Sequence, residues 1–337
     1  MRGVFLGLAA VPMLGASTVA AHHSNTAYDL DRVITFAGTV DRFEWANPHV
    51  YLRVEDDQGI VWQIETDSTP IMTRSGWTRQ SFAQGDSVIV RANPHREGRT
   101  IGLLLSVEGP NGIPLTSRNR TERTADQELV ASAAGLSGVW LGELLPISAK
   151  RRLPFVNDFV THPLTEKGQV ARANYDESMS PTAQCVSWPS PFLLAEAALH
   201  PAEFEIQEDV IIFRSEFFNT ERVIYTDGRE HPVNGERTNQ GHSVGWWEDD
   251  VLIVDTTLFA DHRSPYGGTG VPSGRGKHVV ERYTLAEDGT QLIVDVFVED
   301  PEFLAEPFSG RLVWHYSPHL EMLDFECDSA VATRFGE

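Results

Sequence analysis

The chain is short of cysteine and of long apolar runs, and both shortages narrow the class of protein. Only two of its 337 residues are cysteine, and neither lies in a Cys-x-x-Cys pair, so the sequence indicates no zinc finger and no thioredoxin-like redox site. No apolar stretch reaches the length of a membrane-spanning helix. No glycine-rich phosphate loop or dinucleotide-binding pattern occurs either. We therefore expect no membrane span and no requirement for a nucleotide cofactor.

Basic residues are also scarce. Lys and Arg together number 27 against 48 Asp and Glu, which gives a formal net charge of −21 at pH 7. A surface of this sign repels phosphate backbones and anionic lipids. The composition therefore argues against a nucleic-acid partner, and high solubility is the simplest reading of the charge.

The amino-terminal segment has the pattern of a secretory signal peptide over residues 1–21. Arg2 supplies the charged start, a short apolar stretch follows from Val4 to Leu14, and the small residues Ala20 and Ala21 suit signal peptidase. We expect cleavage near Ala21 and a periplasmic or secreted mature protein.

Cleavage after Ala21 would make His22 and His23 the first residues of the mature chain. A free amine beside an imidazole is a good chelate for copper, and His49, which follows Asn47-Pro48, is a further candidate ligand. The alternatives are that two histidines follow the signal peptide by chance, and that His49 only caps a turn or packs on Trp45.

Cys185 and Cys327 form an even pair, which in an oxidising compartment predicts one disulfide. A loop of this length would stabilise the fold by roughly 4–5 kcal/mol in the chain-entropy model, less any strain. Two free thiols are the alternative.

Alternating apolar residues predict a small β domain over residues 22–108. The first strand is expected over residues 33–40, and residues 50–54 and 60–64 form an expected hairpin. A helix is expected over 69–82, and strands are expected over 87–92 and 101–107. About five strands with one intervening helix are typical of a small OB-like barrel.

Residues 109–135 are polar and rich in turn formers, which predicts a linker, and residues 136–337 form the expected second domain. Its first half is irregular and rich in proline. In its second half we expect strands near 203–207, 210–217, 220–226, 241–248, 251–258, 276–285, 290–299, 307–316 and 321–327. The chain is thus predicted to be mainly β, with a larger antiparallel barrel of the calycin or lipocalin kind, or a sandwich, following the small one.

Two sets of motifs resemble exported bacterial families of unknown function. The first set is His-His-Ser at 22–24, Gly-Thr-Val at 38–40 and Phe-Glu-Trp-Ala-Asn-Pro-His-Val at 43–50. The second is Asp-Gly-Arg-Glu-His-Pro at 227–232, Gly-His-Ser-Val-Gly-Trp-Trp-Glu at 241–248 and His-Val-Val-Glu-Arg at 278–282, although Asp249 stands where the family usually has Gly. The resemblance implies a periplasmic two-domain β protein and carries no reaction with it.

Polar residues share strand faces with apolar ones in the second domain. Period-two spacing puts His242 beside Val244, His278 beside Val280, and Arg222 beside Ile224. If these apolar partners point inward, then His242, His278 and Arg222 surround one pocket inside the barrel, where Arg222 should meet Asp255, Glu248 or a ligand anion. The alternative is that these polar residues are structural.

Two functional hypotheses follow for this domain. In the first, the barrel binds a small hydrophobic or aromatic ligand, held by Arg222, His231, Trp246 and Arg282. In the second, it is a cofactor-independent lyase, isomerase or hydrolase in which His242, His278 and Asp255 are the catalytic residues. Copper binding through His22, His23 and His49 is a third hypothesis for the whole protein.

Overall fold

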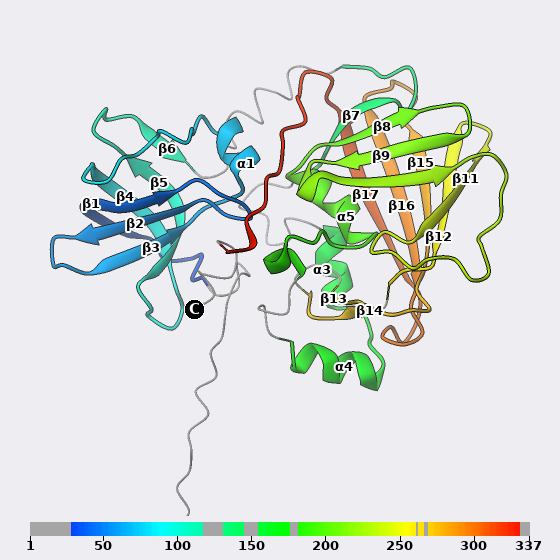
Figure 1. Ribbon diagram of the computed structural model, residues 1–337, viewed down its shortest axis with the longest axis horizontal. Coiled ribbons are helices and arrows are strands. Elements are labelled where there is room, and N and C mark those ends of the chain that lie inside the picture. The colour runs from blue at the N-terminus through cyan, green and yellow to red at the C-terminus, as the bar shows by residue number, and fades with distance from the viewer. Residues whose placement is uncertain are drawn as a thin grey trace, which may run out of the picture.

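The computed structural model describes residues 28–116, 131–144, 154–175, 181–260, 262–265 and 269–330. The expected signal peptide and His22 and His23 lie outside these residues. The described part of the chain is mainly β, with two barrels joined side by side (Figure 1).

The small barrel is built from strands that pair around a closed ring in the order β1-β2-β3-β5-β4, with β6 added beside β5. Its elements are β1 (Ile34–Glu44), β2 (Tyr51–Asp56), β3 (Val61–Glu65), α1 (Thr69–Arg74), β4 (Ser87–Pro94), β5 (Ile101–Glu108) and β6 (Pro114–Thr116). The β3–β5 pair is parallel and the others are antiparallel, with the helix between β3 and β4. The predicted OB-like barrel is confirmed.

Two local features of the small barrel differ from the expectation. Helix α1 ends at Arg74, well before residue 82, because Gly76 adopts a left-handed backbone with φ +84° that ends the helix. Strand β6 lies inside the range expected to be a linker, so the small sheet continues to Thr116.

The large barrel closes through nine strands in the described chain, in the order β10-β11-β12-β15-β16-β17-β7-β8-β9. Its strands are β7 (Gly138–Gly142), β8 (Ala202–Ile206), β9 (Val210–Ser215), β10 (Thr220–Tyr225), β11 (His242–Glu248), β12 (Val251–Thr257), β15 (His278–Leu285), β16 (Gln291–Glu299) and β17 (Phe308–Tyr316). All neighbours are antiparallel except β10 and β11, which are parallel because the 226–241 loop carries the chain back across the barrel. The predicted antiparallel barrel is therefore confirmed, with one parallel pair.

Short helices and strands surround this barrel. They are α3 (Pro154–Val160), α4 (Glu166–Ala173), η3 (Pro181–Gln184), α5 (Phe192–Ala195), η4 (Glu196–Ala198), η5 (Phe217–Asn219), β13 (His262–Pro265) and β14 (Pro272–Ser273). Phe155 and Phe159 of α3 pack on Phe192 of α5 and on Phe308 of β17. The proline-rich segment thus supplies helical cover for the barrel instead of strands.

Residues 321–327, expected to be a strand, form an extended arm that leaves the large barrel and returns to the small one (Figure 1). The arm, residues 317–330, joins the small barrel at Cys327, whose backbone pairs with Asn47. The buried Asn47 side chain donates to the Glu326 carbonyl oxygen at 3.0 Å. The strand expectation was wrong because the partner of this segment is a loop of the other barrel.

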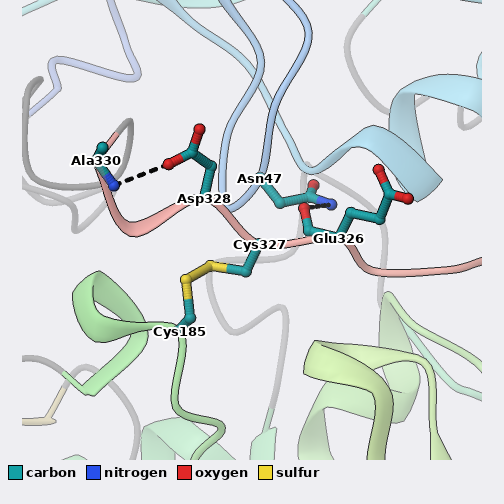
Figure 2. The surroundings of a disulfide bond; sticks show 6 residues. All are labelled: Asn47, Cys185, Glu326, Cys327, Asp328 and Ala330. Atoms are coloured by element: carbon teal, nitrogen blue, oxygen red, sulfur yellow. Dashed lines mark hydrogen bonds between the residues drawn. A yellow bond between two sulfur atoms is a disulfide. The ribbon is translucent and has the colours of Figure 1, made fainter.

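A disulfide fixes the arm to the large domain, as predicted. Cys185, just after η3, bonds to Cys327, with Cα atoms 5.7 Å apart and 142 residues apart in the chain (Figure 2). The arm is also held by Glu216, whose carboxylate is bound by Arg74 of α1, by His200 and by the backbone N–H of Leu323. The two barrels therefore meet at one cross-linked junction.

Candidate functional site

The outer face of the large barrel brings together four of the polar residues expected in the site. The strand register places His242 of β11 opposite Thr257 of β12, and His278 on β15 opposite Glu299 of β16. Asp255 lies two residues before Thr257, on the same face of β12. Adjacent strands are about 4.8 Å apart, so these side chains line one band across the sheet.

His231 reaches this band from the 226–241 loop. Its Nε2 lies 2.9 Å from Oδ1 of Asp255, and its Nδ1 lies 2.9 Å from Nδ1 of His242. The loop turns at Asp227, whose carboxylate accepts hydrogen bonds from the backbone and the side chain of Arg229. That turn carries His231 back over the strands.

His278 closes the other end of the band. Its Nε2 lies 2.7 Å from Oδ2 of Asp255 and its Nδ1 lies 3.2 Å from Oε2 of Glu299. The hydrogen bond to Asp255, helped by Glu299 and opposed by partial burial, raises the pKa of His278 to about 8. His278 is therefore an imidazolium at neutral pH.

The shared carboxylate of Asp255 stays ionised. Partial burial raises the pKa of Asp255, but the hydrogen bonds from His278 and His231 outweigh that effect and hold it below its usual value. Its two oxygens fix two imidazole rings at once, which leaves little freedom in the band.

His242 differs from His278 in its surroundings. Burial, with smaller contributions from His231 and Arg229, lowers the pKa of His242, so its ring is neutral at pH 7. The ring stacks on Tyr225 with centroids 5.2 Å apart. Within the described residues, Nε2 of His242 has no hydrogen-bond partner.

The tautomers of His231 and His242 depend on Asp255, the hydrogen-bond acceptor at one end of the series. In the tautomer in which His231 carries its ring proton on Nε2 and donates it to Asp255, its Nδ1 accepts a hydrogen bond from Nδ1–H of His242. Nε2 of His242 then carries a lone pair. The arrangement supplies an oriented base in His242 and a protonated acid in His278, which is the divergence of pKa values that acid–base sites use.

Arg222 lies elsewhere, inside the barrel. It is 3% exposed and makes a bidentate ion pair with Glu281, with Nη1–Oε1 at 2.9 Å and Nη2–Oε2 at 2.7 Å. Ser243 also accepts from Arg222, and Tyr283 donates to Glu281. The expectation that Arg222 meets Asp255, Glu248 or a ligand anion was wrong.

The expected single pocket of Arg222, His242 and His278 is also corrected. Ile224 does point inward, but Val244 and Val280 are on the outer face, because Ser243 and Glu281 occupy the inward positions of their strands. The barrel interior is polar around Arg222. The rule that apolar residues mark the inner face therefore selected the wrong face of β11 and β15.

Trp246 and Arg282 lie further along the same outer face and form a separate group. Nε1 of Trp246 donates to Glu248 at 3.1 Å, and Nη1 of Arg282 donates to the same carboxylate at 3.2 Å. Both residues pair with Ile253 across the strands, away from the histidine band.

The expected metal ligands are not gathered in the described part of the chain. Across those residues, no group of three or more His, Cys, Asp or Glu side chains could hold a metal ion. His49 places Nδ1 2.9 Å from the Thr66 carbonyl oxygen and 3.6 Å from Glu65. In the histidine band the contacts run in a line and do not converge on one point.

Sequence reasoning missed Glu299 and Tyr225 as members of the site. A signal for Glu299 was present, because His278 lies ten residues before Asp288 and Glu299 ten residues after Gly289, so a hairpin centred on that turn pairs them. Tyr225 carried no comparable signal, since its contact with His242 crosses the parallel pair β10–β11.

Comparison with known proteins adds a family likeness for the small barrel alone. Residues 11–105 match the model of a family of unknown function, DUF6152. No curated protein matches the chain. None of the helices in the described ranges has the length and apolar character needed to cross a bilayer. The match covers less than a third of the chain and leaves the histidine band outside it.

Proposed function

We propose that this protein is a cofactor-independent enzyme that performs acid–base chemistry on a small molecule at the histidine band of the large barrel. The observation that carries the proposal is the hydrogen-bonded series Asp255–His231–His242, which ends in a free ring nitrogen. An oriented imidazole with a lowered pKa is suited to take a proton near neutral pH.

In this proposal His242 is the general base. Its Nε2 takes a proton from water or from an acidic C–H or O–H group of the substrate, and the charge that develops on His242 is stabilised through His231 by the carboxylate of Asp255. His231 and Asp255 are positioning residues, because they act through His242.

His278 is the proposed general acid. Its Nδ1–H points to Glu299, whose side chain is about half exposed, so a leaving group on the substrate can replace that carboxylate. Thr257 of β12 pairs with His242, and its neighbour Thr256 pairs with Val279, the residue after His278. A proton taken at one end and delivered at the other serves hydrolysis, elimination or isomerisation.

We favour this outer site over a ligand inside the barrel. The interior around Arg222 is occupied by Glu281, Ser190 and Tyr283, which are buried and already hydrogen-bonded to one another. A ligand there would have to displace a buried ion pair, which is costly.

The test uses hydrolysis of p-nitrophenyl acetate, which reports the reactivity of an accessible imidazole without knowledge of the natural substrate. We expect His242→Gln to lower the protein-catalysed rate by about 10²-fold, as removal of a general base does. His319→Gln is the matched control, because His319 is exposed and outside the band. Equal rates for the wild type and His242→Gln would reject the proposal.

We further propose that the mature protein is exported after cleavage near Ala21. The disulfide between Cys185 and Cys327 supports this, because such bonds persist in oxidising compartments. Mass spectrometry of the protein recovered from a bacterial periplasm tests the cleavage site, and an uncleaved cytoplasmic product would contradict it.

Copper binding by the mature amino terminus remains a second proposal. Support comes from the small barrel, where Tyr28, five residues after His23, pairs with His95 and hydrogen-bonds Glu65, the carboxylate beside His49. If the His22 amine is a ligand, one extra residue before it should abolish tight copper binding in a titration. Equal affinity with and without the extension would reject the amine chelate.

A further inference from the structure

The junction between the two barrels contains a cavity of about 230 Å³ that the acid–base site does not use. The small barrel contributes Trp45, Arg79 and α1, and the carboxyl-terminal arm contributes Asp324 and Glu326. Ligand sites occur preferentially at domain interfaces, and this volume is below the roughly 300–1,000 Å³ of most ligand pockets, which limits the occupant to a small molecule.

Two opposite charges in this cavity have no ion-pair partner among the described residues. The guanidinium of Arg79 donates through Nη1 to the Trp45 carbonyl oxygen at 3.2 Å, and its other N–H groups have no acceptor in those residues. Glu326 is held by its backbone carbonyl, which accepts from Asn47, while its carboxylate is turned toward α1 and has no donor there (Figure 2). A cation and an anion therefore line one cavity without neutralising each other.

The rest of the lining is partly apolar. Trp45, Pro70 of α1 and Leu323 of the arm contribute its apolar part, beside Thr69 and Thr73. Asp324 is the third charged residue, but it already accepts a hydrogen bond from Asn219, which leaves Glu326 as the free carboxylate. The cavity thus offers a positive end, a negative end and an aromatic side.

The arm that forms one wall is rigidly placed. Cys327, next to Glu326, is bonded to Cys185, and the Phe325 N–H donates to the Asn219 side chain at 2.8 Å. A wall held in position before binding lowers the entropy cost of ordering it around a ligand.

We propose that this cavity is a binding site for a small zwitterion with an apolar side chain, of the chemical class of an α-amino acid. Arg79 binds the carboxylate through charge-assisted hydrogen bonds, Glu326 binds the ammonium group, and the side chain packs on Trp45. This site is independent of the histidine band, so either can fail without the other.

The experiment is calorimetric titration of the intact disulfide-bonded protein with three probes of similar shape: L-leucine, isopentylamine and 4-methylpentanoate. We expect L-leucine to bind with a Kd of about 1 mM or tighter, and each singly charged probe to bind at least about tenfold more weakly. Arg79→Gln and Glu326→Gln should each weaken L-leucine binding about tenfold or more.

Arg91→Gln and Glu55→Gln, at exposed positions on other faces of the small barrel, are the matched controls and should leave binding unchanged. Since Arg79 and Glu326 are exposed, their variants should keep the wild-type melting temperature. No heat from L-leucine up to about 20 mM, or affinity insensitive to both variants, would overturn the proposal. Binding of the amine alone, or of the acid alone, as tightly as L-leucine would overturn the zwitterion assignment.

Discussion

Replacing Arg222 by Met should destabilise the large barrel strongly. The Glu281 carboxylate is fully buried, and in the variant it would keep Ser190 and Tyr283 as its hydrogen-bond donors, neither of which is charged. Removing one member of a buried ion pair typically costs 3–5 kcal/mol, because the other charge is left without compensation. We therefore expect Arg222→Met to lower the free energy of unfolding by about 3–5 kcal/mol.

The assay is urea unfolding followed by circular dichroism, together with the thermal midpoint. For a domain of this size the expected loss corresponds to roughly 6–20 °C in Tm. Arg311→Met is the matched control, since Arg311 forms an exposed ion pair with Asp295, and such pairs contribute about 0–1 kcal/mol.

A double-mutant cycle separates the pair from the packing around it. The double variant Arg222→Met with Glu281→Met removes both charges, so its cost should be smaller than the sum of the two single costs. Some cost remains, because Tyr283 and Ser243 lose hydrogen-bond partners. A loss below about 1 kcal/mol for Arg222→Met, equal to that of the control, would refute the buried-pair reasoning.

Three other predictions concern pH and the disulfide. The pKa of His278 is raised to about 8, so its stabilising contribution is complete below pH 6.5 and is lost as pH rises through 8. The difference in free energy of unfolding between wild type and His278→Gln should therefore shrink from pH 6.5 to 8, and a constant difference would contradict this prediction. The pKa of buried His200 is lowered, chiefly by burial, so the unfolded chain takes up a proton that the folded chain does not. The free energy of unfolding should therefore fall as pH drops below 6.5, and it should fall less in His200→Gln. Thiol labelling of the denatured, unreduced protein should find no free cysteine, and two labelled thiols would exclude the bond. The double variant Cys185→Ser, Cys327→Ser should lose up to about 4–5 kcal/mol of stability.

Most of the individual strands and the hairpins of both barrels were predictable, because alternation and turn residues are local signals. Strand β7 and the two parallel pairs, β3–β5 and β10–β11, were not expected. The Asp249-Asp250 and Asp288-Gly289 turns fixed two hairpins of the large barrel, and their registers bring Asp255 and Glu299 beside the histidines. The disulfide was predictable from the even number of cysteines in a chain whose sequence predicts export.

The inner face of the large barrel was not predictable by the same means. Alternation shows which residues share a face, and burial of apolar residues normally identifies the inner one. On β11 and β15 the inward positions include Ser243, Gly245 and Glu281, while Val244 and Val280 lie on the outer face. Gly245 has to be small because a Cβ there would lie 2.8 Å from Ile224. The inner face follows only from the pairing of Arg222 with Glu281 across the barrel.

The arm was also beyond local signals. Residues 321–327 have a strand-like sequence, but they pair with the Asn47 loop and with Glu216, which are far away in the chain. The Asn-Pro-His motif at 47–49 was read as a source of metal ligands. In the fold, Asn47 holds the arm and the Thr69 N–H, while His49 hydrogen-bonds Thr66.

The tautomer of His242 tests the central claim most directly. Nitrogen-15 NMR of the imidazole rings at pH 7.5 reports which ring nitrogen carries the proton. We predict that His242 is neutral, with the proton on Nδ1 and a free lone pair on Nε2, because Nδ1 donates to His231. In Asp255→Asn this preference should weaken, since His231 loses its carboxylate partner. A wild-type His242 that carries its proton on Nε2, or that is doubly protonated at this pH, would contradict the claim that it is the base of an acid–base site.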